Sequence, residues 1–186
     1  MDAFATATGR HYKPVEYNGH LHAERIIIVM GSAAGTCEEV IDTLLANGEK
    51  VGLIKVRLFR PFSASHLLEI MPQAVKSIAV LDRTKEPGAQ AEPLYLEVTT
   101  TLAEAYSRGE INKLPLTIGG RFGLSSKEFD PPCVLAIFNE LAQVAPRPRF
   151  TVGIYDDVTH LSLPLPKATR PRSFLLEALF YGLGGD

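Results

Sequence analysis

The feature that most constrains the fold of this chain is an alternation of short apolar runs with longer amphipathic segments between residues 25 and 156. Residues 25–31 (RIIIVMG) form a continuous run rich in β-branched side chains, which is typical of a strand buried on both faces of a parallel sheet. Four further runs are expected to form strands, at residues 50–58, 76–82, 114–119 and 150–156. An additional short strand is expected near residues 12–17.

Signals for the beginning of helices separate these runs. Thr36, followed three residues later by Glu39, is a capping-box pattern that predicts a helix beginning at Thr36. Asp130 is expected to cap a helix whose first residue is Pro131. Two more helices are predicted between the strands, at residues 63–71 and 92–108.

The order of these elements predicts the fold class. Five strands alternating with four helices imply right-handed crossovers and a mostly parallel sheet with helices on both faces, which is a three-layer α/β architecture. We assign residues 1–161 to this domain. Residues 162–173 (SLPLPKATRPRS) contain three prolines and are predicted to form an exposed linker. Residues 174–186 begin with the apolar run FLLEALFY and are predicted to start, and not to complete, a further domain.

Composition narrows the range of functions. The chain has 186 residues, of which 46% are hydrophobic and 22% are charged, and a formal net charge of −2, as expected for one globular domain. Lys and Arg are scattered, so neither a nucleic-acid partner nor a membrane surface is expected. No apolar run is long enough to span a bilayer, and the first residues do not resemble a signal peptide, which predicts a soluble cytoplasmic protein.

The two cysteines, Cys37 and Cys133, are far apart in the sequence and form no CxxC motif. Their spacing matches neither a zinc site nor an iron–sulfur site. Both fall on predicted helices beside apolar neighbours, so we expect buried, reduced thiols, which fits a reducing cytoplasm.

Polar loops follow all five predicted parallel strands. In open parallel sheets, ligands bind beyond the carboxyl ends of the strands, so these loops mark the expected working edge. The first loop contains Ser32 and Thr36, where the amides at a helix start can hold an anion; the alternative is a small-residue turn that lets strand and helix pack closely. The five loops cover residues 31–36, 57–62, 82–88, 119–123 and 156–160.

The third of these loops carries two pairs of neighbouring opposite charges, Asp82 with Arg83 and Lys85 with Glu86. The four side chains can form a binding constellation. Alternatively, they satisfy one another within the loop or at an interface between domains, as structural ion pairs commonly do. The sequence favours the second interpretation and leaves the first open.

Three arginines lie in or beside these loops: Arg60, Arg83 and Arg121. A guanidinium group pairs with a phosphate or a carboxylate through two parallel hydrogen bonds, so arginines that converge would form an anion site. Whether they converge depends on the tertiary structure, and the sequence does not decide it.

The last loop offers further polar candidates. Asp156 and Asp157 could ligate Mg²⁺, but adjacent strand residues point to opposite faces, so a loop or capping role is favoured. His160 could act as a general acid or base; no nucleophile pattern accompanies it, which favours a hydrogen-bonded loop histidine. We therefore predict no catalytic residue and no metal ligand in this chain.

Several segments, in this order and spacing, resemble pyruvate:ferredoxin/flavodoxin oxidoreductases. The most specific is LDRTKEPG at residues 81–88, and residues 179–186 (LFYGLGGD) look like the first strand of that enzyme's next domain. The resemblance covers nearly the whole chain. Its other segments are TGRHY at residues 8–12, VRLFRPF at 56–62, GGRFGL at 119–124 and the run at 150–160.

The resemblance implies a domain like the C-terminal domain of transketolase, with a mostly parallel five-stranded sheet, one antiparallel edge strand and helices on both sides. It implies that the whole enzyme, a homodimer, uses thiamine diphosphate, Mg²⁺, [4Fe–4S] clusters and coenzyme A, and passes electrons to ferredoxin or flavodoxin. The family's cofactor and substrate sites lie in other domains, so no cofactor is expected in this chain.

A supporting, non-catalytic role follows from the resemblance, with the loop at residues 82–88 as the first candidate for a domain interface. Two alternatives stay open. One is a self-standing module that binds an anionic small molecule such as coenzyme A. The other is the same domain within a sulfite-reductase-like fusion.

Overall fold

The structure is a computed structural model that describes residues 2–166. Its main part is a six-stranded sheet with the strand order β1-β3-β2-β4-β5-β6. All neighbouring pairs are parallel except β1 with β3, which are antiparallel. The strands are β1 (Val15–Gly19), β2 (Arg25–Met30), β3 (Val51–Val56), β4 (Ser77–Asp82), β5 (Leu116–Arg121) and β6 (Arg149–Thr151).

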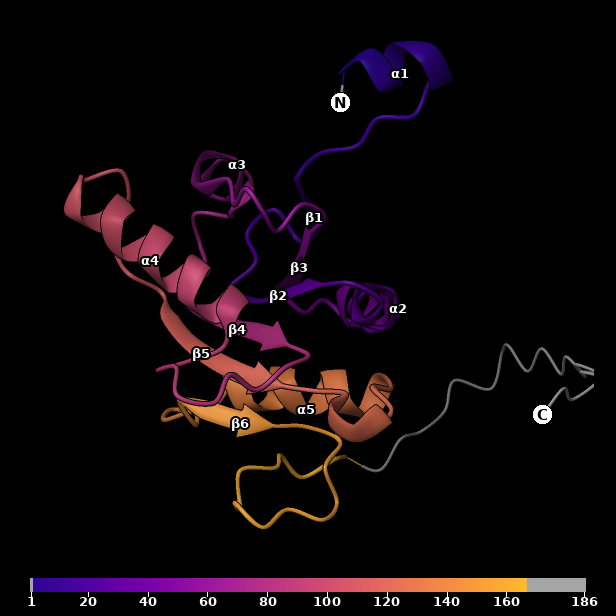
Figure 1. The fold of residues 1–186 in the computed structure, drawn as a ribbon, viewed down its shortest axis with the longest axis vertical. Helices are drawn as coiled ribbons and strands as arrows, with labels where there is room; N and C mark the ends of the chain where they lie inside the picture. Colours follow the sequence, from indigo (N-terminus) through magenta and orange to yellow (C-terminus); the bar gives the residue numbers. More distant parts are fainter. Residues whose placement is uncertain (1, 167–186) are drawn as a thin grey trace, which may run out of the picture.

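Helices cover both faces of this sheet and make three layers (Figure 1). The helices α2 (Ala33–Ala46) and α5 (Pro131–Leu141) pack on one face, and α3 (Ala64–Ile70) and α4 (Pro93–Ser107) pack on the other. A short helix, α1 (Asp2–Thr8), stands away from these layers (Figure 1). The fold class predicted from the sequence is therefore confirmed, including the antiparallel strand at one edge.

The central strand β2 illustrates why the apolar runs become buried strands. Ile27 and Val29 contribute to the core beneath α2 and α5, whereas Ile26 and Ile28 contribute to the core beneath α3 and α4. All four side chains are fully buried. Successive strand residues point to opposite faces, so a strand covered on both sides needs a continuous apolar run, not an alternating one.

Three details differ from the sequence-based expectations. The sheet has six strands, not the five that the family resemblance implies. β5 begins two residues later than expected, and β6 has only three residues because Gly153, at a φ of +72°, turns the chain away. α1 was not predicted from the sequence.

The capping box expected at Thr36 is wrong. Gly31 adopts a φ of +80° directly after β2, which lets α2 begin at Ala33 with Ser32 as its N-cap residue. Two alanines at the helix start favour this early beginning. Thr36 therefore lies inside the helix. The expected cap at Asp130 is confirmed, because its side chain accepts a hydrogen bond from the backbone nitrogen of Cys133.

The first residues of the expected linker remain attached to the domain. Ser162 forms an isolated parallel bridge with Thr151, and Leu163 is buried in the core beneath α2 and α5. The segment beginning at Ser162 is thus not exposed at its start. Residues 167–186 lie outside the described residues, so the division into a linker and a further domain stays a prediction.

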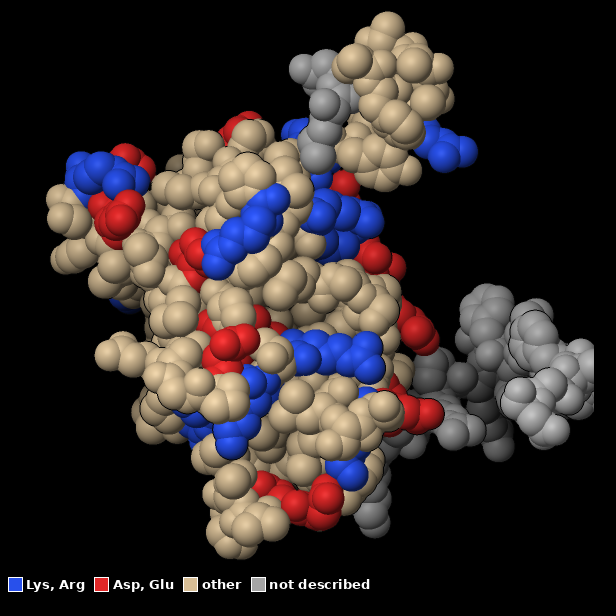
Figure 2. All heavy atoms as spheres, viewed as in Figure 1, with Lys and Arg blue, Asp and Glu red and all other residues tan. Residues whose placement is uncertain are grey.

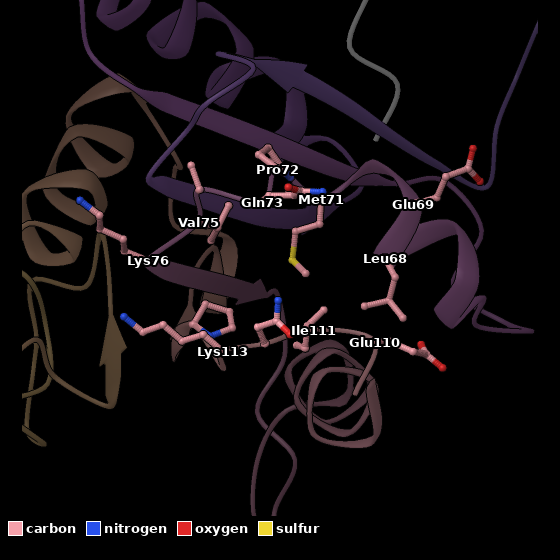
Figure 3. Close-up of a pocket in the computed structure, with 13 residues that line it drawn as sticks. Leu68, Glu69, Met71, Pro72, Gln73, Val75, Lys76, Glu110, Ile111 and Lys113 are labelled. Carbon is pink, nitrogen blue, oxygen red and sulfur yellow. The ribbon is translucent and has the colours of Figure 1, made fainter. Parts of the chain in front are cut away.

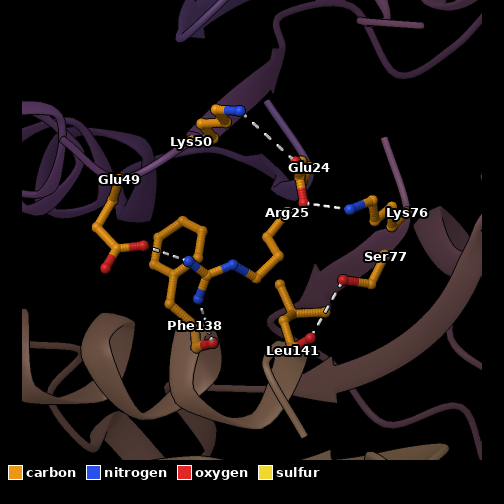
Figure 4. Close-up of polar contacts among 8 residues, drawn as sticks. All are labelled: Glu24, Arg25, Glu49, Lys50, Lys76, Ser77, Phe138 and Leu141. Atoms are coloured by element: carbon orange, nitrogen blue, oxygen red, sulfur yellow. Dashed lines mark hydrogen bonds and ion pairs between the residues drawn. The ribbon is translucent and has the colours of Figure 1, made fainter. Parts of the chain in front are cut away.

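Polar contacts at the amino edge of the sheet hold the end of α5 in place (Figure 4). Arg25 pairs with Glu49 and donates a hydrogen bond to the carbonyl oxygen of Phe138, and Ser77 Oγ donates to the carbonyl oxygen of Leu141 at 3.3 Å. The last carbonyls of a helix have no partner within the helix, so Ser77 at the start of β4 satisfies that of Leu141, and Arg25 at the start of β2 adds a second hydrogen bond to that of Phe138.

Candidate functional site

The carboxyl ends of β2 to β6 meet at one edge of the sheet, which we call the carboxyl edge. The five strands are mutually parallel, so the loops that follow them all leave at this edge. The sequence-based prediction that five polar loops share one edge is confirmed. On the face shown in Figure 2, Lys and Arg side chains lie beside Asp and Glu side chains.

Asp82, at the end of β4, is a structural residue inside the domain. It is 1% exposed, and its carboxylate accepts hydrogen bonds from the backbone nitrogens of Leu94 at 2.9 Å and Tyr95 at 3.1 Å. Burial raises the pKa of Asp82, and the nearby acids Glu92 and Glu86 add to this effect, while the two backbone hydrogen bonds oppose it. Its carboxylate thus caps α4 and does not pair with Arg83.

Glu92, which the sequence analysis did not select, is the partner of Arg121. The guanidinium Nε of Arg121 lies 2.5 Å from the Glu92 carboxylate, and the two side chains are 20% and 4% exposed. Arg121 also lies opposite Asp82 in the pairing of β4 with β5. One arginine and two carboxylates therefore form a buried cluster. The available signal was an acid directly before Pro93, the first residue of α4.

The three arginines do not converge on one point. Arg60 pairs with Glu97 on α4 and stacks over the ring of Phe59 at 4.4 Å. Arg83 donates from Nε to the carbonyl oxygen of Gly123 at 3.4 Å. Each guanidinium therefore has its own protein partner, so the structure does not bring the three arginines to one shared anion site, a question that the sequence left open.

Two hollows at the carboxyl edge bring some of the predicted residues together. A hollow of about 330 Å³ is lined by Ser32, Thr36, Arg83 and Lys127. The start of α2 and two cationic side chains therefore share one depression. Lys127 was not selected from the sequence, because it lies in a loop beyond the segments that stood out there.

A second hollow, of about 240 Å³, is lined by side chains of both charges: Lys85, Arg121, Lys127, Asp156 and Asp157. Lys127 Nζ pairs with Asp156 at 3.0 Å. This pairing lowers the pKa of Asp156. The loops after β4, β5 and β6 thus meet here, with opposite charges close together. Glu86 is exposed and forms no ion pair within residues 2–166.

Asp157 makes the hydrogen bonds that hold the loop after β6 together. Its carboxylate accepts hydrogen bonds from the backbone nitrogen of Ser162 at 2.7 Å and from the hydroxyl of Thr159 at 2.8 Å, and the bond from Ser162 is the main reason for its lowered pKa. His160 is exposed and has a φ of +57°. Within the described part of the chain, no three His, Cys, Asp or Glu side chains gather as a metal site.

The two cysteines are buried, as predicted. Cys37 on α2 and Cys133 on α5 are both free thiols. Burial raises the pKa of each to about 12. Neither thiol is thus available as a nucleophile or as a thiolate ligand in this fold. None of the helices described, which lie between residues 2 and 141, is both long and apolar enough to cross a membrane.

The residues of the first four loops at this edge, including the loop after β4, lie within a segment that matches a known family. The family model described as pyruvate:ferredoxin oxidoreductase core domain II matches residues 23–123, more than half of the chain. The chain belongs to this family. The match includes β2 to β5, the cluster of Asp82, Glu92 and Arg121, and the loop at residues 82–88.

The names of similar proteins are consistent with membership of this family. The chain is 69% identical, over all of its 186 residues, to a protein of Escherichia coli K12 named a probable pyruvate-flavodoxin oxidoreductase. It is 52% identical over its full length to the pyruvate-flavodoxin oxidoreductase of Rhodospirillum rubrum and to the pyruvate:ferredoxin oxidoreductase of Moorella thermoacetica. In each case the chain spans only 16% of the relative's length.

A solved structure is also similar to the chain. It is a 2-oxoglutarate:ferredoxin oxidoreductase from Magnetococcus marinus, with 2-oxoglutarate, coenzyme A and succinyl-CoA bound. The similarity has a TM-score of 0.46 at 21% sequence identity, and it covers 71% of this chain and 20% of that one.

Proposed function

We propose that this chain is a non-catalytic domain of a pyruvate:ferredoxin/flavodoxin oxidoreductase and that its carboxyl edge packs against other domains of the same polypeptide. The observation that carries the proposal is the 69% identity over the whole chain to a relative of which the chain is only 16%. Such a relative has ample sequence outside this domain for the reacting groups.

The whole enzyme would decarboxylate pyruvate oxidatively to acetyl-CoA and CO₂ and pass two electrons to ferredoxin or flavodoxin. Thiamine diphosphate, with Mg²⁺, would supply the carbanion chemistry, and [4Fe–4S] clusters would carry the electrons. The described residues do not fit these groups, because both cysteines are buried apart on separate helices and no three potential metal ligands gather. We therefore derive no chemical step from residues 2–166.

The geometry of the carboxyl edge supports a role in packing. Asp82 and Glu92 are buried and satisfied within the domain, so they hold α4 and β5 together. Arg83, Lys85 and Glu86 extend from this base in a loop with exposed charges. Interfaces between domains of one chain are often of this polar kind. The parent enzyme would work as a homodimer in the cytoplasm, where buried cysteines stay reduced.

Charge reversal in the full-length enzyme tests this role. Arg83→Glu combined with Lys85→Glu should weaken the assembly of the enzyme, seen as a lower thermal midpoint and a lower turnover. Glu39→Lys combined with Asp42→Lys, which reverses two exposed charges on α2, is the control. Unchanged assembly and turnover in the double variant would defeat the proposal.

A second function is favoured by one observation, the hollow of about 330 Å³ that combines Ser32, Thr36, Arg83 and Lys127. Arg83 and Lys127, which also pairs with Asp156, lie beside a helix start and suit an anionic group such as a phosphate of coenzyme A, and Glu128 is the one acid in the lining. Calorimetric titration of this chain with coenzyme A and with inorganic phosphate separates the two functions. Heat of binding that disappears in Arg83→Gln would favour the binding module, and its absence favours the packing role.

A further inference from the structure

A groove of about 570 Å³ lies at the amino edge of the sheet, opposite the carboxyl edge (Figure 3). One wall is the end of α3 with the segment that leads into β4. The other wall is the segment between α4 and β5. Lys76 and Pro115, which directly precede β4 and the β5 strand, line the groove and fix its place in the fold.

Backbone hydrogen bonds hold both walls. The nitrogen of Val75 donates to the carbonyl oxygen of Pro72 at 3.3 Å, and the nitrogen of Glu110 donates to that of Ala105 at 2.9 Å. The nitrogen of Leu116 donates to the carbonyl oxygen of Lys76 at 2.9 Å, which ties the two walls to each other. The groove is therefore already formed in this structure, as binding sites usually are.

Four apolar side chains form one part of the groove's inner surface, beside the polar residues Gln73 and Asn112. Leu68, Met71, Val75 and Ile111 pack against the core beneath α3 and α4, yet each stays partly exposed. Figure 3 shows Met71 and Ile111 on opposite sides of the space. A methionine side chain adapts its shape to what it contacts, so this surface suits an apolar side chain from outside.

The charges at the rim are separated by sign. Figure 3 shows Lys76 and Lys113 at one end of the groove and Glu69 and Glu110 at the other. Lys76 already pairs with Glu24 at 2.5 Å, and Glu110 pairs with Arg108 at 2.7 Å. Lys113 and Glu69 form no ion pair with any residue in the range 2–166. One unpaired cation and one unpaired anion thus flank the apolar surface.

We propose that this groove binds a protruding segment of another domain of the same polypeptide. That segment would carry an apolar side chain between an acidic residue that meets Lys113 and a basic residue that meets Glu69. The inference rests on the proposed function, because it requires the long polypeptide of which this chain would be 16%. It adds a second contact, at the edge opposite the one proposed above.

A second copy of this chain fits the groove less well. The same face of a second copy would present the same groove, and neither of two facing grooves would fill the other. A small zwitterionic ligand would need charged partners that are withdrawn from water, whereas Glu69 and Lys113 are exposed. A projecting segment with complementary charges satisfies both the shape and the charge order of the groove.

Zero-length carbodiimide crosslinking of the full-length enzyme, followed by peptide mass spectrometry, tests the proposal. We expect an amide between Lys113 Nζ and a carboxylate outside residues 1–186. The pair of Lys76 and Glu24, 2.5 Å apart, serves as the internal positive control. Lys113→Arg should abolish the link, because a guanidinium does not react, while it keeps the charge. Enzyme assembled from a mixture of isotope-labelled and unlabelled subunits shows whether the link lies within one polypeptide, because a link between two polypeptides also gives crosslinked peptides of mixed labelling.

A polarity-reversal variant supplies the second readout. Glu69→Lys combined with Lys113→Glu keeps the net charge and exchanges the two ends of the groove. We expect faster amide hydrogen exchange in residues 68–76 and 110–115 of the full-length enzyme, with β2 and β4 unchanged. Asp42→Lys with Lys13→Asp, which exchanges two exposed charges away from the groove, is the matched control and should leave exchange in the groove unchanged.

Three outcomes would overturn the proposal: no link from Lys113 although Lys76 and Glu24 are joined, a link only between two polypeptides, or unchanged exchange after the reversal. The crosslink is measured on the unmodified enzyme, so it does not depend on whether a variant folds. Each of these outcomes leaves the carboxyl-edge proposal untouched, since that proposal is tested by Arg83→Glu with Lys85→Glu.

Discussion

The Oδ1 atom of Asp82 at the end of β4 lies 2.9 Å from the backbone nitrogen of Leu94 in the first turn of α4. The first nitrogens of a helix lack partners within the helix. Here the cap comes from a strand twelve residues earlier and not from the residue directly before the helix. This bond ties together the two ends of the connection between β4 and α4, which contains the loop at residues 82–88.

Replacing this carboxylate should destabilise the domain. Asp82→Ala leaves two buried backbone N–H groups without a partner, which should lower the free energy of unfolding by about 2 kcal/mol. Asp42→Ala removes an exposed carboxylate on α2 and should have little effect. Urea unfolding followed by circular dichroism compares the two variants. Equal midpoints for Asp82→Ala and the unmodified chain would contradict this role.

The raised pKa of Asp82 predicts a specific pH dependence of stability. In the folded chain Asp82 stays protonated at pH values above its ordinary pKa of 3.8. Between pH 3.8 and the raised pKa, the folded state therefore binds more protons than the unfolded state. Stability therefore falls as the pH rises from 3.8 towards the raised pKa. Asp82→Asn removes this contribution.

The difference in unfolding free energy between the unmodified chain and Asp82→Asn, measured across the acidic range, isolates the effect from other carboxylates. We expect the unmodified chain to lose stability relative to Asp82→Asn with rising pH and then to level off. A difference that stays constant, or that changes in the opposite direction, would show that burial does not dominate at this carboxyl group.

The ion pair of Arg121 and Glu92 should behave as a buried pair. Arg121→Met leaves the carboxylate of Glu92, which is only 4% exposed, without a partner. This should lower the free energy of unfolding by about 3 kcal/mol. The value is at the low end for buried ion pairs because Arg121 is 20% exposed. Arg121→Met with Glu92→Leu should cost less than Arg121→Met alone. The exposed pair of Arg108 and Glu104 is the comparison, and its removal should change little. Additive losses in the double variant would argue against coupling.

Gly52 on β3 is required by the side chain that packs over it. A Cβ at this position would lie 2.3 Å from the hydroxyl oxygen of Tyr17, which donates a hydrogen bond to the carbonyl oxygen of His20. Gly52→Ala should therefore destabilise the chain by about 2 kcal/mol through overpacking. Gly35→Ala is the matched control, since a Cβ there meets nothing within 4 Å, and a glycine in a helix costs stability.

The result of the glycine pair is measured by thermal unfolding. A lower midpoint for Gly52→Ala and an equal or higher one for Gly35→Ala are expected. Tyr17→Ala should lower stability less in the Gly52→Ala background than in the unmodified chain, because removing the Tyr17 ring also removes the clash with the new methyl group. If Gly52→Ala unfolds at the same temperature as the unmodified chain, the close approach of Tyr17 is wrong.

The buried thiols should resist labelling. The pKa of about 12 at Cys37 and at Cys133 means that almost no thiolate is present near neutral pH. Iodoacetamide should therefore modify neither residue in the folded chain at pH 8, and both in urea. Peptide mass spectrometry reports each site separately. Rapid labelling of either cysteine in the folded chain would contradict its burial.

Local sequence patterns were sufficient to predict most of the strands and helices and the roles of a few side chains. The β-branched run at residues 25–31 predicted β2, and Asp130 before Pro131 predicted the start of α5. The pattern failed at Thr36, because a turn at Gly31 allowed the helix to begin earlier. Partners such as Glu92 for Arg121 were missed, because they come together only when β4, β5 and α4 are in place.

By itself, the sequence determined that strands and helices alternate, that the sheet is mostly parallel and that both cysteines are buried, because hydrophobic periodicity and end signals are local properties of the chain. Only the tertiary structure decided the strand order, the partner of each charged side chain and the groove formed by residues 68–76 with residues 110–115. The physical reason is that these contacts join residues distant in sequence, and their geometry depends on which strands become neighbours and in what register.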